Sequence, residues 1–355
     1  MSGELTHIID LPRKIVVGKH VLSRVGEYLR SLYGGGRGVL VVTGPNIVNL
    51  YYGILRDSLE ESGFNVWVTT VHEPDLSIAL KVAEESKADR VDVIIGFGGG
   101  KSIDVAKYAS KISGKFFVSI PTVASHDGIA SPYASLRGFD KPISRLAKPP
   151  DAIIVDVSVI ASAPRRYNVA GFGDLIGKLT AVRDWKLASM IKGEYYGEYA
   201  ASLALMSAKH VSMYYKEIAS GSEEGYRVLL EALVSSGVSM CIAGSTRPAS
   251  GSEHLFAHAL TMIAKKPPLH GEAVGVGTII MASLHRLNWR RIKALLKAVG
   301  APTTAKELGV SEEEVVEALM IAPTIRPERY TILGERKLEY DVAYKLARSV
   351  GVIGD

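Results

Sequence analysis

One acid and three histidines in the second half of the chain are residues that could bind a metal ion. His254 and His258 stand four positions apart in a helical stretch, so they share one face of the predicted helix. His270 follows a proline pair and Asp174 follows two glycines, each at the expected start of another helix. An aspartate with two or three histidines on separate helices could ligate Zn²⁺ or Fe²⁺.

The spacing of these residues is not a known metal signature. The segment from His254 to His258 lacks the glutamate that the zinc-protease motif H-E-x-x-H places after its first histidine. Taken one at a time, the histidines fit a structural or surface role, and Asp174 fits a helix N-cap. These residues alone therefore leave the metal site open.

A second candidate is the glycine-rich stretch IIGFGGGKSID at residues 94–104, which leads from a predicted strand into a predicted helix. Its spacing excludes a P-loop, because Ile95 stands where G-x-x-x-x-G-K-S/T has its first glycine. It also excludes the Rossmann fingerprint G-x-G-x-x-G, whose last glycine would fall on Lys101 or Ile103.

What remains in this stretch is a glycine triplet before a helix. Gly98, Gly99 and Gly100 would let backbone amides approach a pyrophosphate, and Ser102 could cap the helix whose dipole favours an anion. The alternative is a plain strand-to-helix turn. The triplet favours an anion site and does not identify the anion.

The elements that must position these residues change character near residue 164. Before it, β-rich apolar runs alternate with helical stretches, which predicts βαβ units and a mostly parallel sheet. The predicted strands cover residues 13–18, 38–43, 64–70, 91–98, 115–122 and 152–158. We therefore predict an α/β dinucleotide-binding domain over residues 1–163.

Beyond residue 164 helical periodicity dominates and no convincing strand follows. The predicted helices cover residues 174–188, 195–218, 224–243, 253–264, 272–285, 290–299, 312–320 and 340–350. We predict an all-helical domain over residues 164–355 that binds the metal and the substrate. The fold class is thus an α/β domain followed by an all-α domain.

Composition narrows the class of protein. The 355 residues carry a formal net charge of +5 without a basic run, which argues against nucleic-acid binding. No apolar run near residues 273–284 or elsewhere reaches the ~20 residues of a membrane span, and the N-terminus has no signal-peptide pattern. The one cysteine, Cys241, cannot form an internal disulfide, so we expect a cytoplasmic protein.

Five segments together resemble a known family. They are IPTVASHDGIASPYASL, GFGDLIGK, GSEHLFAHAL, LHGEAVGVG and RPERYTIL, beginning at residues 120, 171, 251, 269 and 326. The chain resembles the superfamily of metal-dependent polyol dehydrogenases, which includes glycerol dehydrogenase and dehydroquinate synthase. Within it the chain is most similar to the archaeal sn-glycerol-1-phosphate dehydrogenases, over essentially its whole length.

The resemblance assigns roles to individual residues. It implies that one metal ion, usually zinc, is held by Asp174, His254 and His270. Asp127 and His258 would contact the substrate and serve as candidates for proton relay, and Asp174 would touch the substrate as well as the metal. The residues implied in NAD or NADP binding are Gly98, Gly99, Gly100, Lys101, Ser102, Thr122, Val123, Ala124, Ser125 and Ser131.

The implied reaction is the reversible, metal-dependent reduction of dihydroxyacetone phosphate by NAD(P)H to sn-glycerol 1-phosphate. In the family this product is the backbone of archaeal membrane phospholipids. Alternatives are a dehydrogenase of glycerol or another unphosphorylated polyol, a dehydroquinate synthase-like lyase, and a non-catalytic nucleotide-binding protein. The apolar helical faces permit a homo-oligomer, although core packing explains them equally well.

Two details of specificity stay open. Thr43 ends the second strand, where an acid would favour NAD over NADP, so we expect both cofactors to be used. The substrate phosphate needs cations or amides, and the sequence does not choose among its candidates. These are Lys141, Arg145, Arg165, Arg247, Lys265 and Lys266.

Overall fold

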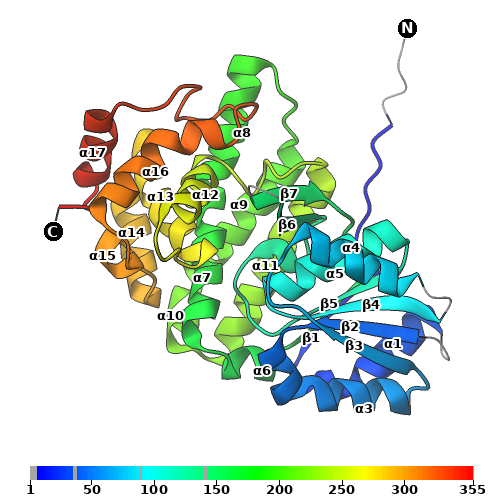
Figure 1. The fold of residues 1–355 in the computed structure, drawn as a ribbon. Helices are drawn as coiled ribbons and strands as arrows, with labels where there is room; N and C mark the ends of the chain where they lie inside the picture. Colours follow the sequence, from blue (N-terminus) through cyan, green and yellow to red (C-terminus); the bar gives the residue numbers. More distant parts are fainter. Residues whose placement is uncertain (1–5, 35–37, 88–89, 139–141, 355) are drawn as a thin grey trace, which may run out of the picture.

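A six-stranded parallel sheet forms the centre of the N-terminal half in the computed structural model, which describes residues 6–34, 38–87, 90–138 and 142–354 (Figure 1). The strand order is β1-β8-β5-β4-β2-β3, and every neighbouring pair is parallel. The strands are β1 Lys14–Gly18, β2 Gly38–Thr43, β3 Asn65–Thr70, β4 Val91–Gly98, β5 Phe116–Pro121 and β8 Ala152–Asp156. The predicted parallel sheet is confirmed.

Both faces of the sheet are covered, as the continuous apolar strands require. Val39 and Val41 of β2 face a core shared with α1 and α3. Leu40 and Val42 alternate to the other face and join the core that continues through α4 and α5 into the helical half. The helices and short turns here are α1 Val25–Tyr33, α2 Pro45–Ile47, α3 Gly53–Glu61, α4 Leu76–Ser86, α5 Gly100–Ser113, η1 Leu22–Arg24, η2 Val48–Tyr52 and η3 Asp127–Ile129.

An antiparallel hairpin of β6 (Tyr133–Arg137) and β7 (Pro142–Leu146) leaves the main sheet. The sequence analysis did not predict it. Its strands are short and mix apolar with polar residues, so they lack the continuous apolar run that marks the buried strands.

The described residues beyond Asp156 form helices joined by loops, without a strand, and this helical half stacks beside the sheet (Figure 1). Its helices are α6 Val157–Ser162, α7 Arg165–Ile176, α8 Lys178–Lys192, α9 Glu198–Met213, α10 Tyr215–Ser220, α11 Glu223–Ala243, α12 Ser252–Ile263, α13 His270–Leu284, α14 Trp289–Val299, α15 Ala305–Leu308, α16 Glu312–Ile325 and α17 Tyr340–Ser349. Two of the predicted helices are wrong in extent: residues 195–218 form the two helices α9 and α10, and the helix predicted over residues 174–188 does not begin at Asp174. Asp174 lies in the last turn of α7 instead of starting a helix, and α8 begins separately at Lys178.

The helix α11 is long and apolar enough to cross a membrane by length and composition alone, but 72% of its apolar window is buried inside the molecule. Its Leu229, Leu230 and Leu233 belong to the central core together with residues of α7 and α12. We therefore assign its apolar residues to core packing. Cys241 on the same helix is buried, as a small core residue would be.

Glycines let α7 and α13 approach so closely that their backbones touch. A Cβ on Gly173 would lie 2.2 Å from the carbonyl oxygen of Gly271, and one on Gly271 would lie 1.9 Å from that of Ala170. The obstacles are backbone atoms, which cannot turn aside as a flexible side chain would. This contact brings Asp174 of α7 near His270, the first residue of α13.

We expect Gly271→Ala to lower the free energy of unfolding by about 2 kcal/mol or more, because the added methyl group must push the two helices apart. Chemical denaturation followed by circular dichroism measures this change.

The matched control is Gly53→Ala in α3, where nothing lies within 4 Å of the new Cβ. This variant should be unchanged or more stable by up to about 1 kcal/mol, because alanine favours a helix more than glycine does. Equal changes in the two variants would mean that the helix contact does not depend on glycine.

Candidate active site

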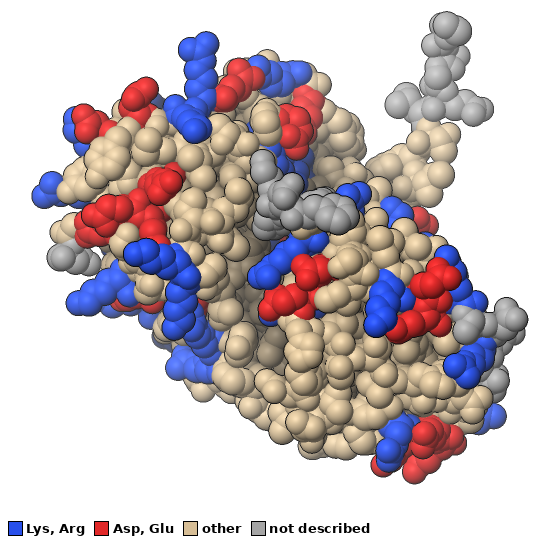
Figure 2. Space-filling model, viewed as in Figure 1, with Lys and Arg blue, Asp and Glu red and all other residues tan. Residues whose placement is uncertain are grey.

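A cavity of about 920 Å³ opens at the carboxyl ends of the sheet strands, between the sheet and the helical half. Gly44 after β2, Gly99 after β4 and Thr122 after β5 line it on the sheet side. His254 and His270 line it on the helical side. Figure 2 shows a hollow between the two halves, with charges of both signs on the surrounding surface. In open α/β sheets this edge is where ligands bind.

Asp174, His254 and His270, predicted as metal ligands, come together at the wall of this cavity: the two histidines line it, and Asp174 is buried beside them. Their potential ligand atoms all lie within 4.8 Å of one another. The Oδ1 atom of Asp174 is 3.3 Å from His254 Nε2 and 3.9 Å from His270 Nε2. Atoms bound about 2.0–2.1 Å from one tetrahedral ion lie roughly 3.3 Å apart. The distance from Asp174 to His254 matches this spacing, and the distance from Asp174 to His270 is longer, so binding would draw His270 inward.

The hydrogen bonds around the cluster also fit a metal. Nδ1 of His254 is 2.8 Å from Oε1 of the fully buried Glu253, which also accepts from the Gly251 N–H. A neutral His254 with its proton on Nδ1 would turn the lone pair of Nε2 toward Asp174 and an ion beside it. Asp174 Oδ1 is buried and makes no hydrogen bond. A buried oxygen without a donor beside an imidazole lone pair is what a cation between them would explain.

The other oxygen of Asp174 is fixed by a buried lysine. Its Oδ2 accepts from Lys178 Nζ at 3.1 Å and from the backbone N–H of Asp127 at 3.2 Å. Lys178 also lies 2.9 Å from Asp127 Oδ2 and donates to the Ala249 carbonyl at 3.1 Å. Burial would lower the pKa of Lys178, but Asp127 and Asp174 outweigh it and raise that pKa. Burial would raise the pKa of Asp174, but Lys178 and His254 hold it well below its usual value.

The predicted substrate residues Asp127 and His258 both line the cavity. Asp127 Oδ2 accepts from Ser236 Oγ at 2.7 Å, in addition to its ion pair with Lys178. The ring centroid of His258 is 5.6 Å from that of His270. Burial, together with the charges of His254 and nearby arginines, lowers the pKa of His258 to about 3. His258 is therefore a neutral imidazole that can donate or accept one hydrogen bond.

The glycine triplet lies at the N-terminus of α5 beside these groups. Gly98 has a φ of +144°, which favours glycine, and a Cβ there would lie 3.0 Å from Ser102 Oγ. Gly98 and Ala124 shape the loops without lining the cavity, and Ala124 donates its N–H to Asn168 Oδ1. The predicted cofactor residues that do line the cavity are Gly99, Gly100, Lys101, Ser102, Thr122, Val123, Ser125 and Ser131.

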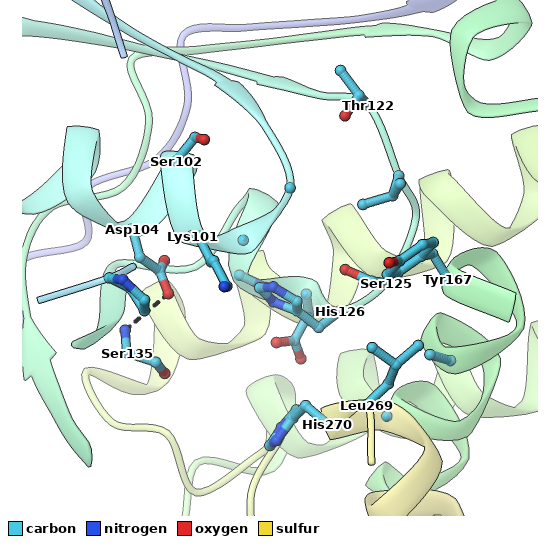
Figure 3. A pocket seen from close by; sticks show the side chains of 18 of the residues that line it. Lys101, Ser102, Asp104, Thr122, Ser125, His126, Ser135, Tyr167, Leu269 and His270 are labelled. Atoms are coloured by element: carbon cyan, nitrogen blue, oxygen red, sulfur yellow. Dashed lines mark hydrogen bonds between the residues drawn. The ribbon is translucent and has the colours of Figure 1, made fainter. Parts of the chain in front are cut away.

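His126 sits between this loop and the metal-like cluster, and its ring points into the cavity together with His270 (Figure 3). Its Nδ1 accepts from the Gly128 N–H at 2.9 Å, so the proton of the neutral ring lies on Nε2. A Cβ on Gly100 would lie 2.2 Å from that Nε2, and one on Gly128 would lie 2.4 Å from Cε1. Two glycines thus make room for an imidazole whose N–H faces the start of α5.

The positions of the basic residues considered for binding the substrate phosphate do not fit that role. None of the five that the structure describes lines it. Arg247 is buried against Glu194, and Arg165 donates to the carbonyls of Ala219 and Val299. Lys141 lies outside the described residues. The remaining candidates are Arg145, Lys265 and Lys266, all of them exposed.

The polar residues at the site to which the sequence assigned no role include Lys178, Glu253, His126 and Arg326. Lys178 follows Asp174 by four positions, which places both on one helical face, and Glu253 directly precedes His254. Those two spacings were readable as supporting contacts. The places of His126 and Arg326 depend on loops that only the folded chain brings to the cavity.

Comparison with known proteins identifies related sequences and folds. Residues 16–164 match a family described as iron-containing alcohol dehydrogenase. Among solved structures, glycerol dehydrogenase from Schizosaccharomyces pombe has a TM-score of 0.81 at 23% identity, covering 97% of this chain and 90% of that one. Sulfoacetaldehyde reductase from Bifidobacterium kashiwanohense, solved in complex with NAD+, has a TM-score of 0.76 at 19% identity, covering 99% and 100%. These likenesses show the fold.

The relatives found by sequence are much more similar to this chain than these solved structures are. Glycerol-1-phosphate dehydrogenase (NAD(P)+) of Aeropyrum pernix is 67% identical, over 98% of this chain and 99% of the relative. The enzyme of the same name from Hyperthermus butylicus is 53% identical, over 99% and 100%. The chain therefore belongs to the glycerol-1-phosphate dehydrogenase family.

Proposed function

We propose that this protein catalyses the reversible, NAD(P)-dependent reduction of dihydroxyacetone phosphate to sn-glycerol 1-phosphate. The observation that carries the proposal is one cavity that joins a metal-like cluster to a glycine-rich helix start. Full-length relatives named for this activity, at up to 67% identity, support the substrate. The stereochemistry of the product rests on those relatives.

Asp174, His254 and His270 would hold one Zn²⁺ ion in this proposal. Two imidazoles and a carboxylate are a donor set that zinc accepts, with a further position open to substrate. When bound, such an ion supplies a Lewis acid for the oxygen of the substrate carbonyl. Glu253 orients His254, and Lys178 orients the Asp174 carboxylate, so both ligands are held before any ion arrives.

The start of α5 would bind the cofactor pyrophosphate through the amides of Gly99, Gly100 and Lys101. The nicotinamide ring, which carries the hydride, would then lie toward Ser125 and Ser131. Lys101 Nζ donates a hydrogen bond to Glu73 Oε1 at 2.9 Å. Because this ion pair occupies the ammonium group, Lys101 would contribute only its positive charge near the phosphates. Gly44 lines the cavity directly after β2, at the position where many NAD-specific enzymes have an acidic residue. Because glycine would not repel the 2′-phosphate of NADP, both NAD and NADP would bind.

Asp127 and His258 would bind the substrate hydroxyls and pass a proton to the oxygen that gains it. One oxygen of Asp127 is committed to Lys178 and Ser236, which fixes the direction of the carboxylate. His258 is neutral, so it would relay a proton by accepting one at one ring nitrogen while it releases one from the other, and it would remain neutral afterwards.

The role of the product in the cell is inferred from the relatives of this chain. We propose that the product supplies the glycerol backbone of archaeal membrane phospholipids, in the cytoplasm. Residues 1–163 would form the cofactor domain and residues 164–355 the metal and substrate domain. Assembly as a homo-oligomer is supported by exposed Tyr199, Met206 and Met213, which follow one face of α9.

The activity assay is oxidation of NADH or NADPH by dihydroxyacetone phosphate with zinc-loaded protein. We expect turnover with either cofactor, sn-glycerol 1-phosphate as the product in chiral analysis, and much weaker turnover of unphosphorylated dihydroxyacetone. Formation of sn-glycerol 3-phosphate, or a preference for the unphosphorylated ketone, would contradict the proposal.

The metal assignment is tested by His270→Ala, with metal content measured by mass spectrometry after dialysis against a trace of zinc. The native protein should retain about one ion per chain, and the variant should lose most of it, because one of three protein ligands is gone. His210→Ala is the control, since His210 packs against Tyr214 away from the cavity. Equal zinc in the native protein and the His270→Ala variant would show that the ion binds elsewhere.

A further inference from the structure

The connection after α16 brings an arginine without a counterion into the cavity. Arg326 directly follows α16 and begins the RPERYTIL segment, to which neither the cofactor nor the metal assigns a role. Arg326 lines the cavity together with His258 and Tyr133. Its guanidinium makes no hydrogen bond and no ion pair with any residue that the structure describes.

The other two Lys or Arg residues of the cavity lining are already compensated. Lys101 lies 2.9 Å and Arg137 lies 3.1 Å from the carboxylate of Glu73. Of the two aspartates in the lining, Asp104 is paired with buried Lys107, and Asp127 is paired with Lys178. Arg326 is thus the one Lys or Arg among the described lining residues that remains available to an anion.

The surroundings of Arg326 are positively charged. Arg329 donates to Ser250 O and, at 2.6 Å, to Thr246 Oγ1, and Arg247 donates to Tyr330 O at 2.9 Å. These bonds fix the segment against the turn that precedes α12.

Three guanidiniums therefore gather at this wall, while one carboxylate, Glu194, forms an ion pair with Arg247. Glu328 attracts Arg326 and Arg329 from a distance. Burial, and then the charges of Arg326 and Arg247, lower the pKa of Arg329 to about 9. A dianion at this wall would relieve the repulsion between these groups.

The wall is also close to the reacting groups. Arg326 lines the same cavity as His258 and His270, whose ring centroids are 5.6 Å apart. A small ketone whose carbonyl lies at the metal-like cluster would extend past His258 toward Arg326. An arginine offers several N–H donors in one plane, a geometry that fits a phosphate group.

We propose that Arg326 binds the phosphate group of the substrate and so makes the site specific for a phosphorylated ketone. The proposal rests on the function proposed above and names the residue that selects its substrate class. Arg329 and Arg247 act as positioning residues, since their own donors are used to hold the segment that carries Arg326.

The test compares Arg326→Met, Arg326→Lys and the exposed control Lys266→Met, each loaded with zinc. In Arg326→Met the KM for dihydroxyacetone phosphate should rise roughly 30-fold or more, because a charged partner of a charged ligand is lost. The KM for NADH and the turnover of unphosphorylated dihydroxyacetone should change little. Arg326→Lys should recover part of the loss, and Lys266→Met should behave as the native enzyme.

A second measurement separates this proposal from the proposed function. Calorimetry with inorganic phosphate should detect binding to the native protein and not to Arg326→Met. If phosphate binding depends on Arg326 while the native protein does not reduce dihydroxyacetone phosphate, the anion site stands and the reaction is wrong. If the native protein reduces it and Arg326→Met keeps the same KM, or loses activity equally with both ketones, Arg326 does not bind the phosphate.

Discussion

The buried carboxylate of Asp174 is the point on which the rest of the site depends. Its Oδ2 is held by Lys178 and by the backbone of Asp127, and its Oδ1 faces two imidazoles without a donor. Neither oxygen reaches bulk water, so the negative charge must be matched inside the protein. Lys178 supplies one part of that match, and the arrangement leaves a place for a cation at the other oxygen.

This charge arrangement also joins the two halves of the molecule. Lys178 belongs to the helical half, but its second partner, Asp127, lies in the loop that follows the sheet strand β5. The loop is further tied to α5 by Lys107, which donates to the carbonyls of Gly128 and Tyr133. The start of α5, where the cofactor phosphates would lie, is therefore connected to the metal-like cluster by buried lysines. Hydride donor and acceptor would then be positioned by the same short loop.

The fold was largely predictable because its strands are continuous apolar runs and its helices keep a clear period. The start of the helix that carries Asp174 was misplaced, because Gly171 and Gly173 read as helix-breaking residues. In the structure Gly173 permits contact with α13, and Gly171 lies against the Ala124 carbonyl. A single sequence does not distinguish a glycine that is needed for close helix packing from a glycine that is needed for a turn.

The site was predictable to the extent that its residues form recognisable segments. The metal-like ligands and the glycine triplet stand in such segments. The structure brings Gly99, Gly100, His254 and His270 to the lining of one cavity, with Asp174 buried beside the histidines. The contact of Lys178 with Asp174 was readable from their spacing of four residues, but the pairing of Lys178 with Asp127, which is distant in sequence, was not. Arg326 was not singled out because its freedom to bind an anion is recognised only once the ion pairs of the other basic residues are known. Both are properties of the folded chain.

The measurement that tests this account most directly is anomalous X-ray diffraction at the zinc edge from crystals of the zinc-loaded protein. The account predicts one peak about 2.0–2.2 Å from Asp174 Oδ1, His254 Nε2 and His270 Nε2. Lys178 should remain on the other oxygen of Asp174. A zinc peak held by other side chains, or no peak at this carboxylate, would contradict it.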